Sequence, residues 1–285
     1  MLTRARLAAA ALLLAQGCAS GARQPATRAP SAQAAQQAQR LFRVTSLGAS
    51  PEDEVVVHLS AMEAVEVAQR WGGLRVPVNL RIHPTHQGLE EASRQSNVPW
   101  MRGWARFDEV ELEAPSRWGG DRAPQNVTEL LSHELTHVVM YQRIGERDTW
   151  MHVQIPLWFR EGMASVTSRQ GYRRMTGEQL GTWLRQHPSD DPWLQADALA
   201  HGAQPVVYGA AHRAFERLLA AHGDEGVGRV LDGLRAELGF DRAFADGVGV
   251  EPQAFLANFR RELEVAAGAG ARGPAVAARV PGQQG

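Results

Sequence analysis

The sequence feature that most constrains this chain is a pair of histidines four residues apart, with a glutamate directly after the first: His133, Glu134 and His137 in the run HELTH. In an α-helix, which turns once every 3.6 residues, both histidines project from the same face. Their imidazoles can then share one cation, at about 2.0–2.1 Å for zinc. Glu134 lies beside the pair and can take a proton from water on that cation. The run therefore predicts a helix that carries part of a metal site.

The residues around this run favour a helix. Asn126 followed by Glu129 has the pattern of an N-cap with its reciprocal partner, and Gly145 is suited to the C-terminal end. Apolar faces for packing are supplied by Val127, Leu130, Leu131, Leu135, Val138 and Val139. We therefore expect a helix that is capped at Asn126 and ends at Gly145.

A second helix is predicted from Pro156, which suits a first helical turn, to a stop at Gly171. It contains Glu161, whose neighbours are mostly apolar. An unpaired buried carboxylate is costly, so Glu161 is expected to be more than a solvated helix charge. Two histidines and one carboxylate leave a fourth zinc position for water, as in catalytic sites. Without this third ligand, His133 and His137 could equally be two core or surface histidines of an ordinary helix that binds no metal.

Composition limits the other chemistry that this chain can carry. The single cysteine excludes intramolecular disulfides and multi-cysteine metal clusters, so a metal must be held by His, Asp or Glu. All 30 basic residues are arginine, which excludes a lysine nucleophile or Schiff base. The net charge of -1 provides no basic field, so no nucleic-acid partner is expected.

Residues 1–18 have the features of an export signal. Arg4 and Arg6 form a short basic region, and residues 7–15 are an apolar run too short to span a bilayer as a mature helix. The run is followed by Cys18 in AQGC, which resembles a bacterial lipoprotein signal with a lipidated cysteine; the alternative is a plain secretory signal. The resemblance implies an exported protein held to a membrane surface through lipid on Cys18, facing the periplasm or the exterior.

Composition also divides the rest of the chain. Residues 19–40 contain almost no large apolar side chain and are expected to form a flexible tether, and residues 267–285 are expected to form a disordered tail. The globular body between them is expected to have an N-terminal α/β part over 41–121 and a helical metal-binding part over 122–266.

Hydrophobic periodicity gives the order of elements in this body. A helix is expected at 60–71, closing at Gly72, and helices follow from 124 to about 265. Strand-like alternation is present at 41–46, 54–59, 78–83 and 106–113. Strands first and helices after predict an α+β fold, with a small sheet packed on a helical half.

HELTH followed by PLWFREGMA resembles the gluzincin zinc metallopeptidases, specifically the peptidase MA-like group, over roughly residues 100–265. The resemblance implies a zincin-like fold, in which a small mixed sheet with an edge strand packs on a mostly helical catalytic half. It also implies one Zn²⁺ ion on His133, His137 and Glu161, with Glu134 as the general base.

Comparison with this family adds three expectations. The Gly-x-Met-Glu-Asn segment that binds a free amine in aminopeptidase relatives is absent, so endopeptidase action is expected. Thermolysin-like sites orient a ligand histidine through an aspartate four residues after the third ligand, where this chain has Ser165; Ser168 or a distant acid are the other candidates. An edge strand, here 106–113, pairs with an extended substrate in this family.

A third segment, VYGAAH, contains Tyr208. Related metallopeptidases place a tyrosine on a downstream helix to donate to the tetrahedral oxyanion. Tyr208 is the candidate here, because Tyr141 and Tyr172 lie in less suitable contexts. His201 and His212 are rival donors, and a tyrosine that only packs between helices is the alternative.

These features predict an exported zinc peptidase that hydrolyses a peptide or protein substrate by metal-activated water, with Glu134 as the base. One alternative is a non-catalytic lipoprotein that retains the zincin fold as a binding or assembly module. The other is a zinc amidase that acts on cell-wall material. Cleavage specificity and oligomeric state are not indicated by the sequence.

Overall fold

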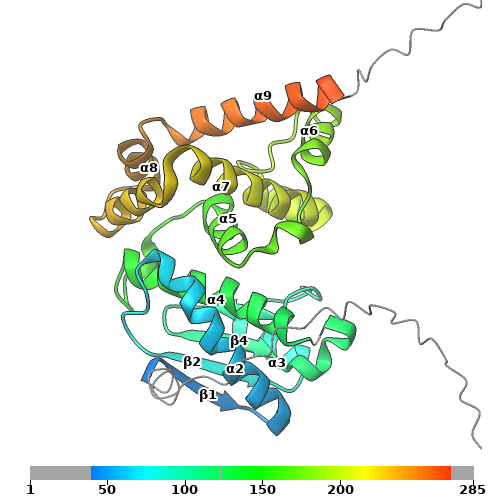
Figure 1. Cartoon of the computed structure of the whole chain (residues 1–285), viewed down its shortest axis with the longest axis vertical. Helices are drawn as coiled ribbons and strands as arrows, with labels where there is room; N and C mark the ends of the chain where they lie inside the picture. The colour runs from blue at the N-terminus through cyan, green and yellow to red at the C-terminus, as the bar shows by residue number, and fades with distance from the viewer. Residues whose placement is uncertain (1–39, 122, 271–285) are drawn as a thin grey trace, which may run out of the picture.

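The computed structural model describes residues 40–121 and 123–270 (Figure 1). Cys18 and the predicted signal, almost all of the predicted tether and residues 271–285 lie outside the described residues. The chain is arranged as two packed halves, one containing a sheet with helices on its faces and the other built of helices. The mixed α+β class predicted from the sequence is confirmed.

The sheet has four strands in the order β1 (Phe42–Ser46), β2 (Val78–His83), β4 (Glu109–Glu113) and β3 (Gly103–Ala105). β1 pairs with β2 and β2 with β4 in parallel, whereas β3 pairs with β4 antiparallel. The strands predicted at 41–46 and 78–83 are confirmed.

The strand predicted at 106–113 is wrong in its first half and in its position in the sheet. The main-chain N–H of Arg106 donates to the carbonyl of Glu109 at 2.8 Å, which closes a tight turn between β3 and β4. β4 therefore begins only at Glu109 and is an interior strand, paired on both sides. The edge strand that precedes the HELTH helix is β3, which the sequence pattern does not show because it is only three residues long.

Glu111 and Glu113 of β4 are buried, although the alternation in this strand predicts a half-solvated face. The Glu111 side chain is fully buried, with the His83 Nε2 atom at 2.6 Å and the Arg81 Nη1 atom at 3.1 Å. The short helix α3 (His86–Ser93) packs against β4 on this face. Ion pairs and a covering helix thus replace the water that the sequence suggested.

The prediction of a strand at 54–59 is wrong, since these residues belong to α2 (Pro51–Ala68). Ser50 caps the helix: its hydroxyl accepts from the Asp53 main-chain N–H at 3.1 Å, and the Asp53 carboxylate accepts from the Ser50 N–H. This capping box starts the helix before the valine run that favours a strand. The predicted end is confirmed, because Gly72 leaves the helical region with a φ of 119°.

The HELTH run lies in α4 (Pro124–Ile144), which ends at Gly145 as predicted. The N-cap is Ala123 rather than Asn126, which is the third residue of the helix. Pro124 explains the difference, since its fixed φ suits the first helical position and it has no N–H that needs a cap. α2 and α4 lie side by side over the apolar face of the sheet (Figure 1).

The second half consists of helices that follow α4 in sequence. They are α5 (Leu157–Thr167), α6 (Gly177–Gln186), α7 (Ala196–Arg235), α8 (Phe240–Val248) and α9 (Pro252–Gly270). α7 contains non-helical residues at Ala203 and Gly223. Short 3₁₀ helices lie at Gln69–Trp71, Pro115–Arg117, Gly119–Asp121, Trp150–His152 and Gln170–Arg173. Among the described residues, no helix combines the length and apolarity needed to cross a membrane.

Two predicted boundaries in this half are wrong. α5 stops at Thr167 rather than Gly171, because Arg169 takes a left-handed φ of 61°. The prediction of a tail from 267 is wrong for its first residues, since α9 continues to Gly270. Ala267 is buried at the point where α9 meets Gly181, and a Cβ on that glycine would lie 3.0 Å from the Ala267 Cβ. Packing that involves another helix, and not composition, holds these last residues helical.

An aromatic cluster fixes α5 against the other helices. Trp158 and Phe159, in the first turn of α5, are almost completely buried. The Phe159 ring lies edge-on to Phe215 of α7 at 5.4 Å, and the Trp158 ring lies edge-on to Phe244 of α8 at 5.8 Å. This packing determines which face of α5 is left to meet α4.

Candidate metal centre

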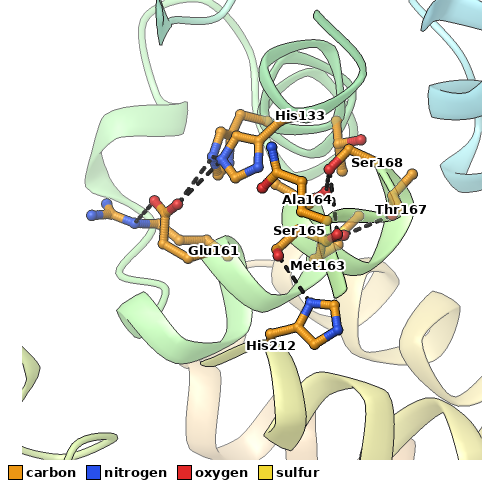
Figure 2. A network of polar contacts seen from close by, with 12 residues as sticks. His133, Glu161, Met163, Ala164, Ser165, Thr167, Ser168 and His212 are labelled. Atoms are coloured by element: carbon orange, nitrogen blue, oxygen red, sulfur yellow. Dashed lines mark hydrogen bonds and ion pairs between the residues drawn. The ribbon is translucent and has the colours of Figure 1, made fainter. Parts of the chain in front are cut away.

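Three predicted ligands meet where α4 faces α5 (Figure 2). The Nε2 atoms of His133 and His137 are 3.2 Å apart, and the Glu161 Oε2 atom lies 3.4 Å from the first and 3.6 Å from the second. A tetrahedral ion with bonds of about 2.0–2.1 Å separates its ligand atoms by about 3.3–3.4 Å. The three atoms therefore have the spacing of three corners of a zinc tetrahedron, and they form a group able to hold a metal among the described residues.

The surroundings of Glu161 keep its carboxylate charged. Burial raises the pKa of this group, but His137 and His133 together hold it well below its usual range by charge and hydrogen bonding. The donor set of two imidazoles and an ionised carboxylate suits zinc, which accepts both ligand types. The fourth corner is left for a molecule from solvent.

Glycine is required directly after Glu161 because α5 crosses α7 there at close range. A Cβ on Gly162 would lie 2.7 Å from the Phe215 Cβ and 3.0 Å from the Ala211 carbonyl carbon. Ordinary contacts of this kind start near 3.4 Å. The close approach sets the position of Glu161 relative to α4, so the "EG" pair in PLWFREGMA has a packing reason as well as a chemical one.

Glu134 lies next to this group, against the edge strand. Burial raises its pKa to about 7, His133 lowers it, Glu161 raises it, and a backbone hydrogen bond from Ala105 lowers it. A Cβ on Gly103 would lie 2.9 Å from the Glu134 Cγ and Oε1 atoms, so β3 leaves room for the carboxylate by having no side chain there. A carboxyl group with a pKa near neutrality can both take up and release a proton at physiological pH.

The candidates for orienting the ligand histidines do not reach them. The Nδ1 atoms of His133 and His137 are buried and have no hydrogen-bond partner within the described chain. Ser165 points away from His133 and toward His212 (Figure 2), and its Oγ atom lies 2.9 Å from the His212 Nδ1 atom. Ser168 donates to the carbonyl of Ala164 at 2.8 Å. No acid takes the place of the aspartate of thermolysin-like sites in the part of the chain that the structure describes.

Tyr208 lies in the electrostatic environment of the metal group. Its pKa is raised, first by burial and then by the charge of Glu161, and Arg160 and Arg174 lower it. The Arg174 guanidinium lies over the Tyr208 ring at 5.5 Å. The pKa of Tyr141 is likewise raised by burial, with contributions from Glu161 and also from Glu134. The charge of Glu161 therefore acts on tyrosines from two helices, α7 and α4, and the Tyr141 ring also stacks on that of His137 at 6.0 Å.

The other predicted donors are placed differently. His212 is buried, and its Nδ1 atom is occupied by Ser165, on the other side of α5 from His133 (Figure 2). Burial lowers the pKa of His212 to about 4. Tyr172 is 70% exposed and donates to Glu129 at 2.5 Å. The backbone of His201 belongs to α7, but its side chain lies outside the described part of the structure.

Reasoning from the sequence missed Arg160 and Gly103 at this centre, and it set Tyr141 aside in favour of Tyr208. Tyr141 follows His137 by four residues, with the two rings stacked at 6.0 Å, and extending the helical spacing by one turn would have favoured it. Arg160 precedes the third ligand directly. Gly103 carries no local signal, because its role depends on which strand lies against Glu134.

Comparisons with known proteins do not assign this chain to a family. No family model matches the chain, and no curated protein matches it. The functional argument consequently rests on the geometry of the centre and on the motifs that supply it.

Proposed function

We propose that this protein is a zinc-dependent peptidase of the gluzincin type, with a zincin-like fold, that cleaves peptide bonds within a peptide or protein substrate. The observation that carries the proposal is the convergence of two imidazole nitrogens and one carboxylate oxygen within 3.2–3.6 Å, with Glu134 beside them. Zinc bound to His133, His137 and Glu161 would supply a Lewis acid that polarises the scissile carbonyl and makes water more acidic. The remaining chemistry falls to the chain itself.

Glu134 would move the proton. At a pKa of about 7, its carboxylate can accept a proton from the attacking water and pass it to the leaving amine. The backbone hydrogen bond from Ala105 and the space at Gly103 hold the side chain in one place for both steps. Burial excludes bulk water from the same carboxylate, which keeps its pKa high.

β3 would align the substrate. Among the described residues it is the last strand in the sheet and pairs only with β4. Its outer edge, apart from the Ala105 N–H that donates to Glu134, would therefore be available to bind an extended peptide by main-chain hydrogen bonds. Because Gly103 lies against Glu134, a peptide added to this edge would pass the proposed base. The role assigned to an edge strand by the family resemblance thus falls on β3 rather than on residues 106–113.

Tyr208 would stabilise the charge that develops on the carbonyl oxygen. Its raised pKa keeps the hydroxyl protonated, so that it can donate to an oxyanion in the transition state. The pKa of Tyr141 is also raised, and the charges of Glu161, Glu134 and Arg160 affect both tyrosines, so Tyr141 is the second candidate for this role. Removing each hydroxyl separately, as Tyr208→Phe and Tyr141→Phe, distinguishes the two.

The decisive experiment combines metal content with peptide hydrolysis. We expect the purified protein to contain one zinc ion, a chelator to abolish cleavage of casein or a quenched peptide, and added zinc to restore it. Glu134→Gln should retain the metal and lose about 10²–10⁴-fold in rate, the contribution of a general base. Glu161→Gln should lose the metal. Turnover that persists in Glu134→Gln would refute the assigned base.

The alternatives predict other outcomes in the same assay. A zinc amidase would release fragments from a peptidoglycan digest and leave casein intact. A non-catalytic module would bind zinc and hydrolyse neither substrate, and it would give no rate difference between the wild type and Glu134→Gln.

The site of action would be a membrane surface, if the signal around Cys18 is a lipoprotein signal. Incorporation of a labelled fatty acid that is lost in Cys18→Ala would support this anchoring. Export without label would indicate a plain secretory signal.

A further inference from the structure

Arg160 lies at the metal centre without being a ligand. It directly precedes Glu161 on α5, and its Nε atom is 3.5 Å from the Glu161 Oε1 atom. The other carboxylate oxygen of Glu161, Oε2, is the one that faces the histidines. The guanidinium group therefore lies beside the Oε1 atom of the third ligand, next to the proposed metal site.

Apart from its ion pair with Glu161, the Arg160 guanidinium makes no hydrogen bond among the described residues. Its Nε atom is buried and has no hydrogen-bond partner among the described residues, and the side chain as a whole is 39% exposed. The two other arginines near this centre are engaged: Arg173 donates to Asn126 at 2.7 Å, and Arg174 donates to Ser165 at 3.1 Å. A guanidinium has five N–H donors, and a buried donor without a partner is unfavourable. Arg160 is thus the arginine of this region that remains able to bind a ligand.

The charge of Arg160 also acts on both tyrosines near the centre. It lowers the pKa of Tyr141, on α4, whose ring stacks on that of His137 at 6.0 Å, and the pKa of Tyr208, on α7. A substrate whose scissile bond lay at the metal would bring its neighbouring residues to Arg160.

The balance of charges favours an anion at this position. Zinc bound by two neutral imidazoles and one carboxylate would keep one positive charge in excess, and the Arg160 guanidinium beside that carboxylate adds a second. Potential of this sign in a partly buried site attracts and orients anionic ligands.

We propose that Arg160 binds a carboxylate of the substrate next to the scissile bond, and so makes the enzyme selective for acidic peptides. The inference rests on the proposed peptidase function. Arginine suits this role because its planar donors can bind both oxygens of a carboxylate. The carboxylate has two possible sources, an Asp or Glu side chain or the free C-terminus of the peptide.

Binding is measured first, separately from hydrolysis. The full-length Glu134→Gln protein, loaded with zinc, is titrated in a calorimeter with pairs of peptides. The two peptides of a pair differ only by Glu or Gln at one position, and each pair tests a different position along the peptide. We expect the Glu peptide with its carboxylate next to the metal to bind about 10- to 100-fold more tightly than its Gln partner. Adding Arg160→Gln should remove most of this difference, and Arg160→Lys, which keeps the charge but not the planar donors, should keep part of it.

Two further arms identify the source of the carboxylate and supply a control. Peptides with an internal Glu and an amidated C-terminus are compared with neutral peptides that have a free C-terminal carboxylate. The type of peptide that binds more weakly to Arg160→Gln identifies the source of the carboxylate. Arg242→Gln is the control, because Arg242 is an exposed arginine of α8 paired with Asp246. It should leave the ratio between Glu and Gln peptides as it is in the wild type.

The result separates this inference from the proposed function. Equal affinity for Glu and Gln peptides, or a preference that Arg160→Gln leaves intact, overturns the carboxylate site even if the wild type cleaves peptides. A wild type that binds acidic peptides through Arg160 and cleaves nothing overturns the peptidase function and keeps the site. Failure of every peptide to bind overturns the site as well.

Discussion

The contact between α5 and α7 allows one prediction to be worked out in detail, for the substitution Gly162→Ala. The added methyl would lie 2.7 Å from the Phe215 Cβ and 3.0 Å from the Ala211 carbonyl carbon, and closer still to the carbonyl oxygen. Since ordinary contacts start near 3.4 Å, the helices must separate by at least 0.7 Å. The obstacle is main chain and a Cβ atom, so no side-chain rotation relieves it.

The magnitude follows from two opposing effects. Overpacking in a core costs about 1–3 kcal/mol, and a rigid main-chain obstacle puts this site at the upper end. Alanine is better than glycine in a helix by up to about 1 kcal/mol. The net loss in the free energy of unfolding is then about 2 kcal/mol, which corresponds to a fall in Tm of about 4–8 °C for a domain of this size. Moving α5 also moves Glu161 away from the histidines, so metal affinity should fall by about 10- to 100-fold.

Thermal unfolding of the metal-free protein and zinc titration test these two consequences separately. Gly202→Ala is the matched control, because a Cβ at Gly202, on α7, meets nothing within 4 Å. It should leave both quantities near their wild-type values. If Gly162→Ala matched the wild type in Tm and zinc affinity, the argument that this glycine positions Glu161 would be refuted.

Two further predictions concern Gly103 and His212. In Gly103→Ala the new Cβ would take the space of the Glu134 carboxylate. We therefore expect the metal content to stay at its wild-type value and the rate of peptide hydrolysis to fall at least 10-fold. A wild-type rate would mean that Glu134 does not need this position. Burial lowers the pKa of His212 from its ordinary 6.5 to about 4. Between these two pH values the unfolded chain binds a proton at His212 and the folded protein does not. The free energy of unfolding therefore has its full value above pH 6.5 and decreases as the pH falls toward 4, by about 3 kcal/mol at most. Denaturant unfolding at pH 7.5 and 4.5 should show a smaller loss in His212→Gln than in the wild type, and equal losses would contradict this assignment.

Local signals in the sequence were sufficient for much of the fold. The alternation in β2 and the stop at Gly72 depend on residues close together in the chain, and both are confirmed. The error at 54–59 arose where two local signals compete, because a valine run follows directly on the cap formed by Ser50 and Asp53. The cap prevailed because it lets a helix begin that buries Val57 and its helical neighbours.

Long-range packing decided what the sequence pattern did not show. The place of β4 inside the sheet depends on the three-residue strand beside it, and the burial of Glu111 depends on partners about thirty residues away along the chain. The same holds for the centre. The spacing of His133 and His137 is a property of one helix, whereas the neighbours of Glu134 come from a strand whose edge position is a property of the whole sheet.

The origin of the three ligands has a mechanical consequence. Two of them belong to α4, which packs on the sheet, and the third belongs to α5, which is built into the helical half. An ion bound by all three ligands would crosslink the two halves, and separating the halves would require breaking the bonds to the metal. At a free zinc concentration 100 times the Kd, the bound ion would add about 2.7 kcal/mol to the free energy of unfolding. Metal supply would then govern how long the folded protein survives, in addition to whether the proposed activity is present.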